Sequence, residues 1–243
     1  MRRLHFDGPP MPDGLILIDK PAGPTSHDVV DLIRRRFQIP KVGHGGSLDP
    51  QATGLLIIMI NKGTKVSNLF LGSDKEYEGT FRLGLTTDSY DLDGQVTSTA
   101  DFSGITRERM EAELAKFQGD MMQMPPMVSA IKKGGVPLYK LARAGETVER
   151  ELRFIHLYEC SLQSFTPPDA DFRVRCTKGT YVRSICHDLG QALGCGAALA
   201  RLRRTGSGRF RVEAALPLDA ALALSRADFA ARILPLGQAL PNA

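Results

Sequence analysis

The sequence predicts a mixed α/β fold, because helical and strand-like hydrophobic patterns alternate along its 243 residues. The strand-like segments are not consecutive in the chain, and helical patterns separate them. A hydrophobic content of 42% is sufficient for a substantial core. Neither an internal repeat nor a low-complexity linker divides the chain, so we expect one domain over residues 1–243.

The first quarter of the chain predicts an irregular lead-in, a strand, a helix and a second strand. Three prolines precede the apolar segment 15–18, which is typical of a strand. Residues 26–37 have apolar side chains at helical spacing, with Ser26 as the expected N-cap and Pro40 as the stop. The continuous apolar segment 55–60 favours a buried strand.

The rest of the chain alternates in the same way. Segment 77–83 alternates as a half-buried strand does, and pairing with segment 55–60 would bring Tyr77 beside Asp49. A helix is expected over 106–117, and methionines and prolines in 121–127 interrupt regular structure. A short helix flanked by glycines, 138–143, suggests a protruding flap within about 121–150. The remaining expected elements are strands 151–162 and 172–176, separated by a turn, helix 181–193, and strand 209–212.

The segment 42–56 is glycine-rich and surrounds a single carboxylate, Asp49. Glycines permit backbone conformations and close approaches that a Cβ would forbid, and Pro50 fixes φ directly after the acid. A ligand could therefore come very near Asp49. An ordinary turn before strand 55–60 would give the same pattern, and spacing alone leaves both interpretations open.

Composition limits the possible functions. The net charge of +4 is mildly basic, which is compatible with nucleic acid without implying it. Lys and Arg residues occur in several clusters along the chain, and each cluster alone is typical of a charged surface exposed to solvent. The four cysteines lack CxxC spacing and fit neither a disulfide scaffold nor a zinc site, so we expect buried thiols. No apolar signal region or membrane-length segment is present, so a cytoplasmic location is expected. The phosphate-binding and dinucleotide-binding glycine motifs are also absent.

Six blocks in order resemble the TruB family of pseudouridine synthases. The segment around Asp49 resembles the catalytic loop of that family, and Leu15–Gly23 resembles its opening strand and Lys-Pro turn. The other blocks are Asp74–Tyr77 with the segment through Gly94, Gln123–Lys132 with residues up to Gly145, Lys178–Ile185, and Leu202–Arg204.

The resemblance implies a pseudouridine-synthase fold with a curved, mostly antiparallel sheet, and conversion of uridine 55 to pseudouridine in the T-arm of tRNA. Asp49 matches the catalytic aspartate, Arg183 its arginine partner, and Tyr77 the active-site tyrosine. Tyr181 and Leu202 match residues that wall the pocket. The reaction requires no metal or organic cofactor.

The resemblance also implies which residues contact RNA. His44 matches a histidine that fills the space left by the flipped base, and Lys20 resembles a lysine near the active site that could contact a phosphate. The remaining expected RNA-binding residues are Lys132, Arg143, Arg203 and Arg204. Gly45 and Gln51 depart from the common threonine and leucine, which suggests a looser loop near His44.

Family members often carry a C-terminal PUA domain, and too few residues follow Arg211 for one here. We therefore expect a catalytic domain nearly alone, acting as a monomer without a guide RNA. Two other function classes remain. One is a tRNA-binding or tRNA-folding module with little or no catalysis. The other is a metal-dependent nuclease using Asp88, Asp91 and Asp93, although this acidic segment is more simply interpreted as a turn.

Overall fold

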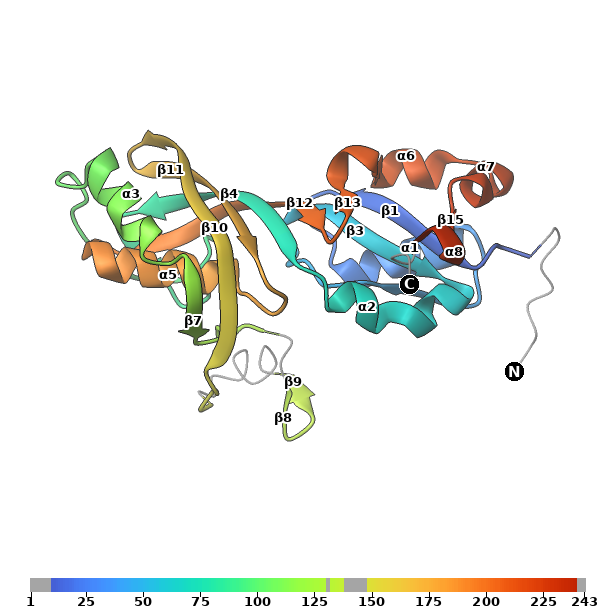
Figure 1. The fold of residues 1–243 in the computed structure, drawn as a ribbon, viewed down its shortest axis with the longest axis horizontal. Helices are drawn as coiled ribbons and strands as arrows, with labels where there is room; N and C mark the ends of the chain where they lie inside the picture. Colours follow the sequence, from blue (N-terminus) through green and yellow to red (C-terminus); the bar gives the residue numbers. More distant parts are fainter. Residues whose placement is uncertain (1–9, 130–131, 138–147, 240–243) are drawn as a thin grey trace. The chain divides into compact units, whose positions relative to one another are not determined.

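The computed structural model describes residues 10–129, 132–137 and 148–239 (Figure 1). The chain forms two compact units. The first comprises Met1–Ser73 together with Arg203–Ala243, and the second comprises Asp74–Leu202. No helix in the described ranges is long and apolar enough to cross a membrane.

The sheet of the first unit is built around two long strands, β1 (Gly14–Lys20) and β3 (Thr53–Ile60), which pair antiparallel. β3 also pairs in parallel with the C-terminal part of β12 (Ala197–Ser207). Short strands extend this sheet: β2 (Val42–His44), β13 (Phe210–Arg211), β14 (Leu216–Pro217) and β15 (Leu234–Pro235).

Helix α1 (Ser26–Arg36) begins and ends at strong local signals. Thr25 is the N-cap and forms a capping box with Asp28, so the expected N-cap at Ser26 is wrong by one residue. Ser26 is instead the first helical residue and is buried. Three arginines in the last turn complement the helix dipole.

Alternating side chains of β1 and β3 divide the core of the first unit into two layers. One face carries Ile16 and Ile58, and it packs against α1, α6 (Leu218–Ala223) and α7 (Arg226–Ala231). The opposite face carries Leu17 and Ile57, and it packs against Phe70 and Val212. Phe70 belongs to α2 (Ser67–Leu71), and Val212 belongs to η2 (Val212–Ala214). The first unit also contains η1 (Asn61–Val66) and α8 (Leu236–Ala239).

The second unit contains an antiparallel sheet in the order β4, β11, β10, β7. These strands span Lys75–Leu83, Asp169–Cys176, Arg153–Thr166 and Gly119–Gln123, respectively. β4 is also hydrogen-bonded to β12, whose residues up to Leu202 belong to this unit. Two small strand pairs accompany the sheet: β5 (Leu85–Thr87) with β6 (Val96–Thr99), and β8 (Lys132–Lys133) with β9 (Val136–Pro137).

Two helices lie in the described part of the second unit. α3 (Arg107–Ala115) packs against β10 and against α5 (Val182–Leu193). Within the sheet, the rings of Phe81 and Phe172 stack with centroids 3.9 Å apart. A Cβ at Gly79 would lie 2.7 Å from the Phe172 ring, so this position holds a glycine for lack of space.

The predicted fold class is confirmed as mixed α/β with a mostly antiparallel sheet. Segments 55–60 and 77–83, whose pairing would bring Tyr77 beside Asp49, do not pair with each other: β3 pairs with β1, β2 and β12, whereas β4 pairs with β11 and β12. Part of the segment expected to be irregular, 121–127, belongs to β7. The expected helix 138–143 lies outside the described residues. The four cysteines are buried thiols, as expected.

Candidate functional site

Asp49 lies in residues 45–52, which join β2 to β3 and are called the Asp49 loop below. Asp49 is exposed, whereas Leu48 before it is only 6% exposed. The amide of Ala52 donates to the carbonyl of Asp49 at 3.1 Å and closes a turn. The carboxylate is therefore presented at the surface by a loop whose neighbouring residue is buried.

Ser26 connects the first turn of α1 to this loop. Its hydroxyl Oγ accepts from the amide of Leu48 at 2.8 Å and donates to the carbonyl of Leu48 at 3.2 Å. Both backbone groups of the residue before Asp49 are thus hydrogen-bonded to one buried side chain. Ser26 is a site residue that sequence reasoning missed, because a serine at a helix start is typical of an N-cap.

Arg204 extends from β12 to the same loop. The side chain is buried, with 2% of its surface exposed. Its guanidinium donates to the carbonyls of Leu55, Gly46 and Ser47 at 2.7, 3.1 and 3.2 Å. The structure thus gives Arg204 an internal role in place of the expected contact with RNA.

Lys20 holds the other side of the loop. Its ammonium donates to the carbonyls of Pro21, Pro24 and Pro50, each at 2.8 Å, and the residue is fully buried. A lysine ammonium has three N–H donors, so all three are used by backbone carbonyls. Lys20 therefore joins the Lys-Pro turn to the residue after Asp49, and its donors do not face a phosphate.

The charge state of Lys20 is linked to Asp49. Burial lowers the pKa of the Lys20 ammonium to about 8, and the negative charge of Asp49 opposes this shift. The positive charge of Arg204 lowers the Lys20 pKa further. At neutral pH Lys20 is mostly protonated, so two buried cations flank the backbone around a single exposed carboxylate.

His44 is the last residue of β2 and is held by strand pairing with Ile58. Burial first, and then the charges of Arg204 and His27, lower the pKa of the imidazole, so it is neutral at pH 7. Its Nδ1 is buried and has no hydrogen-bond partner among the described residues. A Cβ at Gly45 would lie 2.9 Å from Cβ of Phe70, so the segment beside His44 is tightly packed and the expected looseness is wrong.

Arg203 forms a bidentate ion pair with Asp19 of β1. Its two terminal nitrogens lie 3.0 and 2.6 Å from the two carboxylate oxygens. The Arg203 side chain is still 41% exposed. Adjacent arginines on one strand thus have different environments: Arg204 is buried behind the Asp49 loop, and Arg203 lies at the surface.

The second unit carries the predicted aromatic residues. Tyr77 lies on β4 opposite Val174 of β11 and is 8% exposed. Tyr181 is the N-cap of α5 and is half-buried. Gln123 at the end of β7 accepts from the Tyr181 amide at 2.8 Å and donates to the Tyr181 carbonyl at 3.0 Å. Leu202 lies half-buried on β12.

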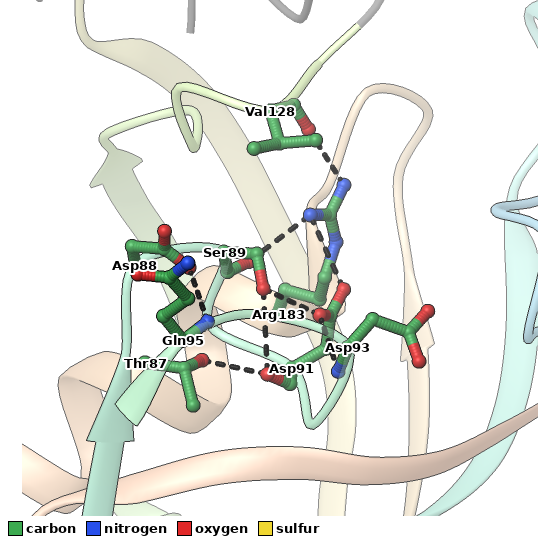
Figure 2. A network of polar contacts seen from close by, with 8 residues as sticks. All are labelled: Thr87, Asp88, Ser89, Asp91, Asp93, Gln95, Val128 and Arg183. Carbon is green, nitrogen blue, oxygen red and sulfur yellow. Dashed lines mark hydrogen bonds and ion pairs between the residues drawn. The ribbon is translucent and has the colours of Figure 1, made fainter. Parts of the chain in front are cut away.

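Arg183, in the first turn of α5, is held by a polar network (Figure 2). Its guanidinium donates to the carbonyls of Val128 and Ser89 at 2.8 and 3.0 Å and lies 3.4 Å from the carboxylate of Asp91. The side chain is 5% exposed. The other oxygen of the Asp91 carboxylate accepts from the Ser89 hydroxyl at 2.5 Å. Arg183 is therefore fixed from two loops and from one carboxylate.

The acidic segment beside Arg183 is a turn. The Asp91 carboxylate accepts from the amide of Asp93 at 3.2 Å, and Asp88 accepts from the amide of Gln95 at 2.9 Å. The described residues contain no group of three or more His, Cys, Asp or Glu side chains placed to bind a metal. These contacts favour the turn interpretation over a nuclease site.

The structure brings Lys20, His44 and Arg204 together around the Asp49 loop, in the first unit. It places Tyr77, Tyr181, Arg183 and Leu202 in the second unit. The expected contacts of Asp49 with Tyr77 and Arg183 join the two units and stay predictions. The side chain of Lys132, in β8, and all of Arg143 lie outside the described part of the chain.

Sequence reasoning missed Gln123 as a site residue and considered Asp91 only for a nuclease site or a turn. Both lie in blocks that resemble the family, but Asp91 is in a segment typical of a turn. Gln123 precedes a Met- and Pro-rich segment that carries no periodicity. Asp91 faces the Arg183 side chain of α5, and Gln123 binds the backbone of Tyr181 at the start of that helix. Both partners are distant in sequence, so no local pattern predicts these roles.

Two family models match the chain. The TruB family pseudouridylate synthase N-terminal domain matches residues 34–182, and the tRNA pseudouridylate synthase B C-terminal domain matches residues 183–240. The chain belongs to the TruB family of pseudouridylate synthases. A pseudouridylate synthase is an isomerase, so this TruB-family chain is an enzyme.

Curated relatives and solved structures agree with the TruB assignment. The tRNA pseudouridine synthase B of Opitutus terrae is 53% identical over 230 residues, covering 95% of each chain. The same-named protein of Burkholderia pseudomallei (strain 668) is 47% identical, covering 92% of this chain and 74% of that one. A solved Cbf5-Nop10-Gar1 complex contains a chain that is 30% identical, with a TM-score of 0.74. This match covers 94% of the TruB-family chain and 62%, less than two thirds, of the solved chain.

Proposed function

We propose that the chain converts uridine 55 to pseudouridine in the T-arm of tRNA, with Asp49 as the catalytic carboxylate. Membership of the TruB family and the names of the curated relatives support tRNA as the substrate. The observation that carries the proposal is the Asp49 loop itself. Its carboxylate is exposed, whereas buried groups hold the backbone on both sides.

The reaction breaks the C1′–N1 glycosidic bond, turns the uracil, and joins C5 to the same sugar carbon. The C5 proton is then released. A carboxylate can attack or stabilise the electron-poor C1′, as nucleophilic carboxylates do in glycosidases. One carboxylate is sufficient because no water has to be activated. A loop anchored at Leu48 and Pro50 suits this task, since it limits the directions in which Asp49 can point.

The second unit would supply the remaining groups. Arg183 would keep the Asp49 carboxylate ionised through a charge-assisted hydrogen bond. Tyr77 would stack on the uracil and place its hydroxyl for proton transfer. Tyr181 and Leu202 would wall the pocket and exclude water.

A uridine inside a folded T-arm has to be flipped out, which costs a few kcal/mol in stacking and pairing. His44, neutral and half-buried, is suited to fill the vacated space, since an uncharged ring stacks without losing the hydration of a cation. Arg203, Lys132 and Arg143 would contact phosphates. For Arg203, loss of a contact to a duplex phosphate should flatten the log–log salt dependence of tRNA binding by about one unit.

Tritium release from unmodified tRNA labelled at uracil C5 tests this proposal. The reaction uses the wild type, Asp49→Asn, and a tRNA whose uridine 55 is replaced by cytidine. Asp219→Asn is the matched control, because it removes an exposed carboxylate on α6 of the same unit. We expect release from the wild type and from Asp219→Asn, and none from Asp49→Asn or from the replaced tRNA.

Filter binding of the same tRNAs separates binding from chemistry. Asp49→Asn is nearly isosteric, so its tRNA affinity should stay within a few-fold of wild type. Release from the replaced tRNA would assign a different target. Tight binding by the wild type without release would instead support the tRNA-binding or tRNA-folding module.

A further inference from the structure

We propose that Arg204 is a positioning residue that fixes the direction of Asp49 by binding the carbonyls of the preceding loop residues. This inference rests on the proposed function, because it assigns Arg204 to the same reaction. It also removes Arg204 from the set of expected RNA ligands.

The first argument is burial. A buried charge is unfavourable unless its polar atoms have partners, and Arg204 is 2% exposed. The hydrogen bonds of its guanidinium end on three carbonyls, those of Gly46, Ser47 and Leu55. Two belong to the Asp49 loop and the third to the strand that follows it. The hydrogen bonds of the Arg204 guanidinium are therefore made to these carbonyls, and its burial shields it from a phosphate.

The second argument is the way in which β12 approaches the loop. Arg204 pairs with Gly54 of β3, and a Cβ at Gly54 would lie 2.3 Å from the Arg204 carbonyl. Gly54 has a φ of +100°, a conformation that favours glycine. Close approach of the two backbones at this point brings the guanidinium within reach of the loop carbonyls.

The third argument is that three different side chains hold three different parts of the backbone around Asp49. Arg204 binds the carbonyls of Gly46 and Ser47, Ser26 binds both backbone groups of Leu48, and Lys20 binds the carbonyl of Pro50. Removing Arg204 would release the carbonyls of Gly46, Ser47 and Leu55, whereas the bonds to Leu48 and Pro50 on either side of Asp49 would remain. The loop would remain folded, but the carboxylate would sample more directions.

The test compares Arg204→Met and Arg204→Lys with Arg36→Gln. Arg36 is a matched control, because its guanidinium also donates to two backbone carbonyls of the first unit, those of Leu222 and Leu224, at 2.8 and 3.0 Å. We measure the single-turnover rate of tritium release, the tRNA Kd as a function of salt, and hydrogen exchange of residues 45–52.

Arg204→Met should lower the single-turnover rate by about 10- to 100-fold, since a small misplacement of a reacting group has effects of this size. Its tRNA Kd should stay within about three-fold of wild type, with an unchanged salt slope. Arg204→Lys keeps one cation for these carbonyls and should recover part of the rate. Exchange in residues 45–52 should rise in both variants, and Arg36→Gln should match wild type in rate and exchange.

An unchanged rate with a weaker, less salt-dependent Kd would return Arg204 to the RNA-binding residues and overturn the proposal. Unchanged exchange in residues 45–52 would overturn it as well. If Arg204→Met does not fold, Arg204→Lys decides alone: a wild-type rate contradicts the proposal, and a slower rate at unchanged Kd supports it. Absence of release by the wild type would contradict the proposed function, whereas hydrogen exchange would still report on Arg204.

Discussion

Gln123 and Tyr181 are joined by a reciprocal pair of hydrogen bonds, in which one side-chain amide satisfies both backbone groups of the other residue. Gln123 is the last residue of β7 and is 1% exposed, and Tyr181 is the N-cap of α5. The pair fixes the start of the helix that carries Arg183 two residues later. A buried polar contact at the sheet thus helps to position two predicted site residues, the pocket-wall residue Tyr181 and Arg183.

Gln123→Leu should reduce the free energy of unfolding by about 1–3 kcal/mol, because it leaves the Tyr181 amide and carbonyl without their partner. Urea unfolding measures the loss. Gln163→Leu is the matched control, since Gln163 is exposed on β10 and bonds only to Ser161 in the described contacts. The control should stay within about 0.5 kcal/mol of wild type. Equal losses in both variants would show that the reciprocal pair adds nothing.

Asp91→Asn should slow isomerisation while tRNA affinity is kept. The change removes the negative charge that lies 3.4 Å from the Arg183 guanidinium, while the hydrogen bonds to the carbonyls of Ser89 and Val128 remain (Figure 2). The charge of the buried arginine is then less well compensated. We expect a stability loss of about 1–3 kcal/mol and a slower single-turnover rate.

Asp101→Asn serves as the control for loss of an aspartate charge in the same unit, because Asp101 is exposed and bonds locally to Ser103. It should leave both rate and stability near wild type. A wild-type rate in Asp91→Asn would mean that the two carbonyls suffice to hold Arg183, and the assigned role of Asp91 would be dropped.

The elements that sequence predicts correctly are those with a local signal. α1 and α5 have helical apolar spacing and β3 has a continuous apolar segment, and each forms close to its expected range. β12 has no expected counterpart, because Ala197–Ala200 carries little strand propensity and the strand depends on pairing with distant segments.

The candidate site likewise contains one residue with a local sequence signal and others whose roles depend on distant contacts. Asp49 is apparent from its glycine-rich surroundings, but the roles of Lys20 and Arg204 are not. A cation in a sequence predicts an exposed side chain, and both of these are buried against carbonyls. Only the strand pairing that brings β12 beside β3 reveals which of the adjacent arginines, Arg203 or Arg204, faces the loop.

The lowered pKa of Lys20, about 8 against an ordinary value of 10.5, predicts a pH dependence of stability. Between these two values the unfolded chain retains a proton that the folded chain has released, so stability contributed by this group rises with pH. Below pH 8 both states are protonated and the full penalty of burying the charge is present.

Urea unfolding of wild type and Lys20→Met between pH 7 and 10.5 isolates this contribution, because other titrating groups act in both proteins. The stability difference should shift in favour of wild type as the pH rises above 8. A difference that does not change with pH, or that shifts toward Lys20→Met, would contradict the lowered pKa of Lys20.

Gly54→Ala should be strongly destabilising, because two independent effects act at this position. An alanine at φ +100° is strained, and its Cβ would lie 2.3 Å from the Arg204 carbonyl. Strain and overpacking of about 1–3 kcal/mol each give an expected loss of about 2–6 kcal/mol in urea unfolding. Gly237→Ala is the control, since no atom lies within 4 Å of its added Cβ, and it should stay within about 0.5 kcal/mol of wild type.

Gly54→Ala also tests the link between backbone approach and the Asp49 loop. If the variant folds at low temperature, β12 has to move away from β3, and the bonds from Arg204 to Gly46 and Ser47 should weaken together. Hydrogen exchange in residues 45–52 should then rise toward the level of Arg204→Met. A folded Gly54→Ala with wild-type exchange in this segment would mean that the guanidinium holds the loop without the close pairing at Gly54.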